Sequence, residues 1–135
     1  MDTEGVEGVL HAGGTPIVTI TGCVIVAIRD DLDDQSVMHL QDELVEEVAR
    51  RGARGVIIDI SALEIVDTFA GRMIGSMAQM ARMMNARTIL VGMRPAVAMT
   101  LVELGMTLVG VETALNADKA MNLIVNDLPP VALAQ

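Results

Sequence analysis

A short apolar run, GVIIDI at residues 55–60, constrains the fold of this chain most. Nearly continuous apolar runs of this length are typical of central parallel strands that are covered on both faces. Apolar residues also recur at spacings of three and four on either side of the run, as on one face of a helix. Before the run they are Val37, Leu40, Leu44 and Val48, and after it Phe69, Met73, Met77, Met80 and Met84. The pattern predicts a buried strand between two amphipathic helices.

The rest of the chain continues this alternation of strands and helices. Strands are predicted at residues 17–20, 23–28, 88–91 and 106–111, and the Thr-Gly pair at 21–22 indicates a hairpin between the first two. Pro95 suits the first turn of a third helix, and Asn116 caps a fourth. The resulting order, ββαβαβαβα, predicts an α/β fold with a mixed, mainly parallel β-sheet packed against about four α-helices.

The chain of 135 residues has a length that fits one domain. Residues 15–128 carry the alternating pattern and are predicted to form that domain. Residues 1–14 are rich in Gly, Glu and Thr without periodicity, so they are predicted to be a flexible N-terminal arm. Residues 129–135, PPVALAQ, are predicted to be a flexible C-terminal tail.

Composition excludes several classes of function. The chain has 18 acidic and 9 basic residues and a net charge of −9, which disfavours nucleic acid and anionic lipid because both need a basic surface. Phe69 is the single aromatic residue, so stacking on bases is disfavoured as well. No apolar stretch approaches the roughly 20 residues of a membrane span, and the acidic start is unlike a signal peptide. We expect a cytoplasmic protein that binds neither nucleic acid nor membrane.

The sequence indicates no enzyme, no metal site and no cofactor. The phosphate-binding patterns GxGxxG and GxxxxGKS or GxxxxGKT are absent. The sole cysteine, Cys23, lies in an apolar run, and neither His11 nor His39 has a Cys or His neighbour at ligand spacing. Ser61 follows a predicted strand but lacks both a GxSxG frame and a histidine base.

Two groups of residues have two interpretations each. The first group is the acidic cluster Asp30, Asp31, Asp33 and Asp34. Its main interpretation is a helix start, where negative charge suits the helix dipole, and its alternative is an acidic contact surface for a partner. The second group is the 11 methionines. Their main interpretation is that they fill the core at helical spacing, and their alternative is an exposed interaction surface.

The junction Asp67-Thr68 carries the strongest functional signal. Both residue types cap helices by accepting hydrogen bonds from backbone N–H groups, so a helix start is the plain interpretation. A hydroxyl there, at the end of a parallel strand, is also accessible to a kinase. A phosphate on Thr68 would suit the helix N-terminus, and it would change the surface charge sharply beside Asp67. The junction therefore fits a phosphorylation switch on a binding surface.

The same stretch resembles a known signature. Residues 55–69, GVIIDISALEIVDTF, resemble the central signature of STAS domains, the anti-sigma-factor antagonist family, and the resemblance spans about residues 16–128. Three further segments resemble the small scaffold subunits of stressosomes within that family. They are LDDQ at 32–35, GMRPAVAMTLVELG at 92–105, and ETAL at 112–115.

The resemblance implies a single STAS domain that uses no cofactor and acts as a binding module, not as an enzyme. Such a subunit co-assembles with larger STAS paralogues and holds a switch serine/threonine kinase. Phosphorylation of the subunit releases that kinase, and a cognate phosphatase restores the resting state. Homo-oligomers, as dimers or higher, are also expected. The alternative is a freestanding anti-anti-sigma factor that binds an anti-sigma kinase directly, with a flavodoxin-like enzyme a distant third.

The phosphorylated serine of the family falls on Thr68, whose extra methyl group crowds the hydroxyl. The larger paralogues carry threonine at this position and a second phosphorylated threonine, which matches Thr100. By residue chemistry alone, a mid-helix threonine such as Thr100 donates back to a carbonyl near Ala96. The predicted switch surface consists of Thr68 with Asp67, Phe69, Asp33 and Asp34.

Overall fold

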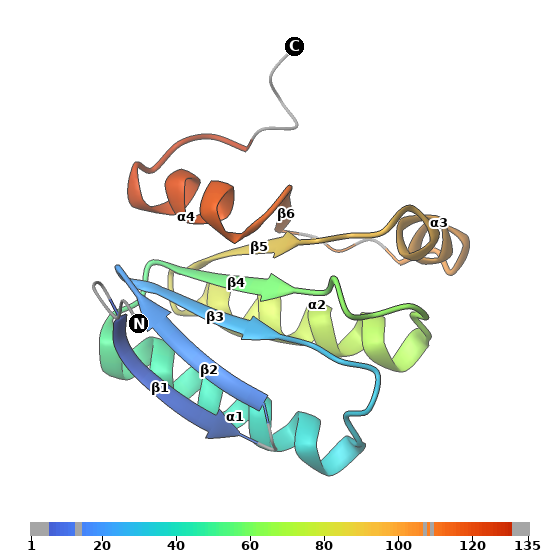
Figure 1. Ribbon diagram of the computed structural model, residues 1–135, viewed down its shortest axis with the longest axis horizontal. Coiled ribbons are helices and arrows are strands. Elements are labelled where there is room, and N and C mark those ends of the chain that lie inside the picture. Colours follow the sequence, from blue (N-terminus) through green and yellow to red (C-terminus); the bar gives the residue numbers. More distant parts are fainter. Residues whose placement is uncertain (1–5, 13–14, 107, 109, 131–135) are drawn as a thin grey trace.

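The computed structural model describes residues 6–12, 15–106, 108 and 110–130, which form a six-stranded sheet with helices on both faces (Figure 1). The strands are β1 (Val6–Ala12), β2 (Thr15–Ile20), β3 (Cys23–Ala27), β4 (Gly55–Asp59), β5 (Arg87–Val91) and β6 (Val111–Ala114). The helices are α1 (Asp34–Arg51), α2 (Thr68–Met83), α3 (Pro95–Glu103) and α4 (Ala117–Val125). The predicted α/β class is confirmed.

The sheet is mixed and mainly parallel, as predicted. Strands β3 to β6 run parallel, whereas β1 pairs with β2 and β2 with β3 in antiparallel fashion. In register, Ile25 of β3 lies beside Ile57 of β4, which lies beside Ile89 of β5. Val56, Ile57 and Ile58 have no exposed surface, so β4 is buried on both faces.

Two apolar cores lie on opposite faces of the sheet. On one face, α1 and α2 bury residues such as Leu40, Leu44 and Ile74 in a core shared with β2 to β5. On the other face, α4 contacts β4, β5 and β6 and contributes Leu123 and Ile124 to a smaller core. The helices thus hold the central strands between two layers.

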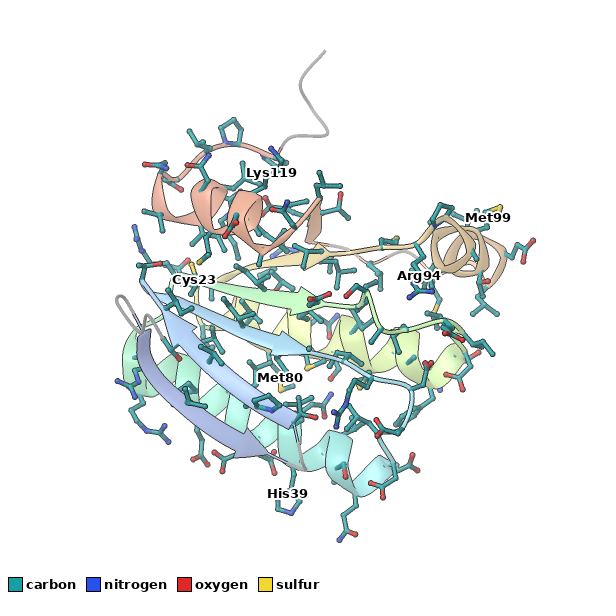
Figure 2. All side chains as sticks on the ribbon, in the orientation of Figure 1. Cys23, His39, Met80, Arg94, Met99 and Lys119 are labelled. Atoms are coloured by element: carbon teal, nitrogen blue, oxygen red, sulfur yellow. The ribbon has the colours of Figure 1, made fainter. Side chains whose placement is uncertain are left out.

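The methionines divide between their two interpretations. Four on α2 or at its end fill or border the core: Met73, Met77, Met80 and Met84. By contrast, Met38, Met83 and Met99 are exposed, and Figure 2 shows Met99 on the outer side of α3. Core filling is therefore the main role, and a minority of the methionines add apolar surface.

Residues 6–12 form strand β1, where the sequence predicted a flexible arm. The strand is held by backbone pairing with β2, which needs no apolar pattern in its own sequence. A Cβ at Gly8 would meet the guanidinium of Arg51 on α1, so a larger residue there would require the Arg51 side chain to move. Residues 1–5 and 13–14 of the predicted arm, and residues 131–135 of the predicted tail, lie outside the described residues.

The last strand begins later than predicted. The sequence predicted a strand at residues 106–111, whereas β6 spans Val111–Ala114. Of the predicted segment, Met106 and Leu108 pack against the core and do not pair with β5, and residues 107 and 109 lie outside the described residues. Alternating apolar side chains occur both in strands and in loops that pack on the core, so the sequence pattern did not distinguish the two.

Glu47 on α1 is a carboxylate without exposed side-chain surface. It accepts hydrogen bonds from the Thr19 hydroxyl on β2 at 2.9 Å and from Arg51 Nε at 3.0 Å, and it pairs with Arg50. Burial raises the pKa of Glu47, but the hydrogen bonds from Thr19 and Arg51 and the charges of both arginines outweigh it and hold the pKa below its ordinary value. The carboxylate therefore joins α1 to the antiparallel half of the sheet.

Glu47→Gln is expected to lower the free energy of unfolding by roughly 1–3 kcal/mol at neutral pH, because the buried carboxylate loses its charged hydrogen bonds with Thr19 and the two arginines. Because the folded-state pKa lies below the unfolded value of about 4.3, the carboxylate stabilises the fold above that value and loses this effect as pH falls through the folded pKa. Urea denaturation should therefore show a smaller loss of stability on acidification for the variant than for wild type. The exposed neighbour Glu46→Gln is the control, and equal effects of both variants would contradict the prediction.

Candidate functional site

The candidate site lies at the edge of the sheet where the parallel strands end. The segments after β3, β4 and β5 are joined there by backbone hydrogen bonds, from Ile28 N–H to the Asp59 carbonyl at 2.9 Å and from Ile60 N–H to the Val91 carbonyl at 3.0 Å. Helices α1 and α2 begin at this edge (Figure 1). Loops at the carboxyl ends of parallel strands commonly carry binding sites, because strand direction brings them together.

Asp67 and Thr68 start α2, as predicted. The Asp67 side chain accepts a hydrogen bond from the Ala70 N–H at 2.9 Å, so Asp67 is the N-cap and Thr68 is the first helical residue. Thr68 is exposed, and its hydroxyl makes no hydrogen bond within the described part of the chain. The hydroxyl stands at a helix N-terminus, where unpaired N–H groups favour an anion.

Asp33 and Asp34 start α1 at the same edge. Asp33 accepts a hydrogen bond from the Ser36 N–H at 2.7 Å, and its bonds with Ser36 lower the pKa of the Asp33 carboxyl. Asp34 is exposed in the first turn, where its charge suits the helix dipole. The helix start predicted for these residues is confirmed, and their role as a contact surface stays a prediction.

A groove of about 360 Å³ separates α1 from α2 beside these helix starts. Asp34 and Met38 line it from α1, and Phe69 and Arg72 line it from α2. Phe69 is 43% exposed and Met38 is 65% exposed, so the groove offers apolar surface next to one acidic and one basic group. The structure therefore brings Asp34 and Phe69 together from two different helices.

Arg94 was not predicted as a site residue, yet it ties the loop after β5 to this edge. Its Nε donates to the Ser61 carbonyl at 3.0 Å, in the loop that follows β4 (Figure 2). Gly92 permits this close approach, because its φ is +74° and a Cβ there would lie 2.7 Å from the Ser61 Cβ. The signal in the sequence is the Gly-Met-Arg-Pro segment after a strand, where glycine and proline set the backbone around the arginine.

Thr100 lies within α3 and does not line the groove between α1 and α2. Its hydroxyl donates to the Ala96 carbonyl at 2.9 Å, so the predicted bond back to the helix is confirmed. The residue is partly buried. Thr100 is therefore a less accessible phosphate acceptor than Thr68.

The described residues restrict the chemistry of this part of the molecule. Among them, no three or more His, Cys, Asp or Glu residues are placed to hold a metal ion. Over the same ranges, no helix combines the length and apolar character that crossing a bilayer requires. The edge presents an exposed hydroxyl, several carboxylates and apolar surface.

Comparison with known proteins agrees with the fold. The family model described as STAS domain matches residues 15–120. The chain belongs to the STAS family. A solved structure of Moorella thermoacetica RsbS with a serine-to-glutamate substitution is 38% identical to this STAS domain, with a TM-score of 0.73 over 83% of this chain and 95% of that one. A chain from the solved architecture of the stressosome is 39% identical, with a TM-score of 0.73 over 82% of this chain and 96% of that one.

Curated relatives of this STAS domain are longer proteins from Bacillus subtilis. The RsbT co-antagonist protein RsbRB is 24% identical over 109 residues, and the RsbT co-antagonist protein RsbRA is 30% identical over 77 residues. These matches cover 80% and 57% of this chain but only 39% and 28% of the relatives. The chain thus spans less than half the length of these relatives, whereas it covers nearly all of the RsbS chain.

Asp67→Ala is expected to destabilise the protein by about 1 kcal/mol, because the Ala70 N–H loses its acceptor at the start of α2. Asp67→Asn should keep most of the stability, since an amide oxygen can accept the same hydrogen bond. Thermal unfolding of both variants against wild type measures the difference. Equal losses would show that the charge of Asp67, and not its capping bond, stabilises the helix.

Proposed function

We propose that this STAS domain is a stressosome scaffold subunit that reversibly binds a switch serine/threonine kinase and releases it when Thr68 is phosphorylated. The observation that carries the proposal is the position of the Thr68 hydroxyl, which is exposed at the first residue of α2. The similarity to a chain of the solved stressosome, over most of both chains, supports a place in such an assembly. In this proposal the chain is the substrate of the kinase and catalyses no transfer itself.

Phosphorylation places charge where the fold tolerates it. The Thr68 hydroxyl oxygen attacks the γ-phosphorus of ATP, the bond to the ADP oxygen breaks, and the hydroxyl proton passes to a base of the kinase. The new group carries about −1.5 to −2 charges at neutral pH. Because a helix N-terminus favours anions, α2 stays folded while the charge of the surface changes.

The added charge would release the kinase by repulsion. Thr68 follows Asp67 directly, and Asp33 and Asp34 begin the neighbouring helix at the same edge. A phosphate therefore strengthens the negative potential of a surface that is already acidic, which repels an acidic surface on the kinase. Burying the phosphate against the kinase would also cost desolvation free energy.

The groove between α1 and α2 supplies the apolar part of the proposed kinase surface. Phe69 and Met38 are the exposed apolar side chains that line it. Aromatic and methionine side chains are enriched at the centres of protein interfaces. Because Phe69 is adjacent to Thr68 in α2, a kinase that binds the groove also covers the phosphate acceptor.

Larger STAS paralogues and a cognate phosphatase complete the proposed cycle. Relatives described as RsbT co-antagonist proteins are the kind of paralogue expected to co-assemble with this chain. The phosphatase hydrolyses the phosphate ester on Thr68 and returns the surface to its resting charge. Thr100 is a second candidate acceptor, and its phosphorylation would require the bond to the Ala96 carbonyl to break.

Thr68→Ala should abolish the main phosphorylation by the cognate kinase, whereas Thr68→Ser should be modified at least as fast as wild type because the crowding methyl group is gone. Mass spectrometry after incubation with kinase and ATP measures both rates. Thr100→Ala is the matched control and should leave Thr68 phosphorylation in place. Thr68→Glu should weaken capture of the kinase. An unmodified Thr68 in wild type, or normal kinase release by Thr68→Ala, would refute the proposal.

Size-exclusion chromatography with a larger STAS paralogue tests the scaffold role. A particle far larger than either subunit is expected, and phosphorylated Thr68 should let the kinase leave it. A small species that binds only an anti-sigma kinase would indicate the freestanding anti-anti-sigma factor in place of the scaffold.

A further inference from the structure

The two ends of the sheet differ in charge. Acidic residues gather where the parallel strands end: Asp30, Asp31, Asp33, Asp34, Asp59, Glu64 and Asp67. At the opposite end, where α1 and α2 finish and β4 and β5 begin, five of the nine basic residues form what we term the arginine edge: Arg50, Arg51, Arg54, Arg82 and Arg87. Backbone hydrogen bonds join this end, from Arg54 N–H to the Gly22 carbonyl at 2.9 Å and from Arg87 N–H to the Arg54 carbonyl at 3.0 Å.

Two arginines of the arginine edge have no carboxylate partner among the described residues. The other three are paired with Glu47 or Glu112. The Arg54 side chain donates to the Val125 carbonyl at 3.5 Å, and the Arg82 guanidinium makes no hydrogen bond or ion pair within the described part of the chain. Both are exposed. Their charges are therefore available to an acidic partner.

The arginine edge is concave. A hollow of about 530 Å³ is lined in part by Arg82, by Arg87 and by the Glu112 carboxylate that pairs with Arg87, and a second hollow of about 300 Å³ is lined in part by Arg54 and Met84. Asn85 lines both, so the two hollows lie next to each other. Each contains one of the two arginines without a carboxylate partner. A concave basic surface is complementary to a protruding acidic segment.

The acidic loop at residues 30–34, Asp-Asp-Leu-Asp-Asp, is such a segment. It connects β3 to α1, and its four Asp residues are all exposed. The Asp31 side chain is 73% exposed, with an ion pair to Arg29 at 3.4 Å. The loop lies at the end of the sheet opposite the arginine edge.

We propose that the arginine edge binds the acidic loop of a second copy of this chain, head to tail. The argument is charge complementarity, because one chain carries both surfaces at opposite ends of one sheet. Two copies with a net charge of −9 repel in most orientations, and this orientation places opposite charges together. The contact is heterologous, so every pair keeps one free loop and one free arginine edge, to which further copies add.

The contact uses Arg54 and Arg82 on one copy and the acidic loop on the other, and it requires neither Thr68 nor ATP. The acidic loop overlaps the proposed kinase surface at Asp33 and Asp34, whereas the arginine edge lies at the opposite end of the sheet. Loss of self-association and loss of Thr68 phosphorylation are measured by different experiments, so a failure of one proposal is distinguishable from a failure of the other.

Sedimentation equilibrium of the purified chain tests the proposal. The weight-average mass of wild type should rise with protein concentration at low ionic strength, and salt should reverse the rise because exposed charges are screened. The variant Arg54→Glu/Arg82→Glu should associate at least about tenfold more weakly, as should Asp30→Lys/Asp31→Lys. Mixing the two variants should restore association, because the native loop of the first then meets the native arginine edge of the second.

The control is Lys119→Glu on α4, which Figure 2 labels, compared with the single variant Arg82→Glu, because each changes the net charge by −2. Lys119→Glu should associate more tightly than Arg82→Glu, and thermal melts should confirm that every variant is folded. The proposal is overturned if wild type stays monomeric at low ionic strength. It is also overturned if the control associates as weakly as Arg82→Glu, or if the mixture of variants fails to associate.

Discussion

The parallel register of β3, β4 and β5 decides most of what this molecule presents to its surroundings. Strands that run in the same direction need a crossover after each strand, and α1 and α2 make those crossovers. Each helix therefore starts at one end of the sheet and finishes at the other. Burial of Val56, Ile57 and Ile58 holds the register, because a slip by one residue would turn each side chain to the opposite face.

The same direction sorts the charges of the molecule. Asp33 and Asp67 cap α1 and α2 at one end, while Arg50, Arg51 and Arg82 occupy the last turns of these helices at the other. Both placements suit the helix dipole, so local helix stability already separates acid from base along the sheet. The proposed switch uses the acidic edge, and the proposed self-association brings the acidic edge of one copy to the arginine edge of another.

Elements that depend on side-chain pattern were predictable from the residues. The cap at Asp67 and the buried strand β4 follow from residue types and spacing within a few positions. Strand β1 was not predictable, because it is held by backbone pairing with β2 and not by an apolar pattern of its own. The position predicted for the last strand was wrong because Met106 and Leu108 pack against the core from a loop and are not part of the strand.

The features of the candidate site also divide into those set by local sequence and those set by the tertiary fold. The sequence alone indicated that Thr68 begins a helix and carries an accessible hydroxyl, because capping acts within one turn of backbone. Only the folded chain decided that Asp34 and Phe69 share a groove, that Arg94 reaches the Ser61 carbonyl, and that the arginines gather at one edge. These relations depend on how strands pair and helices pack. Such contacts join segments that are far apart along the chain, so no local sequence pattern predicts them.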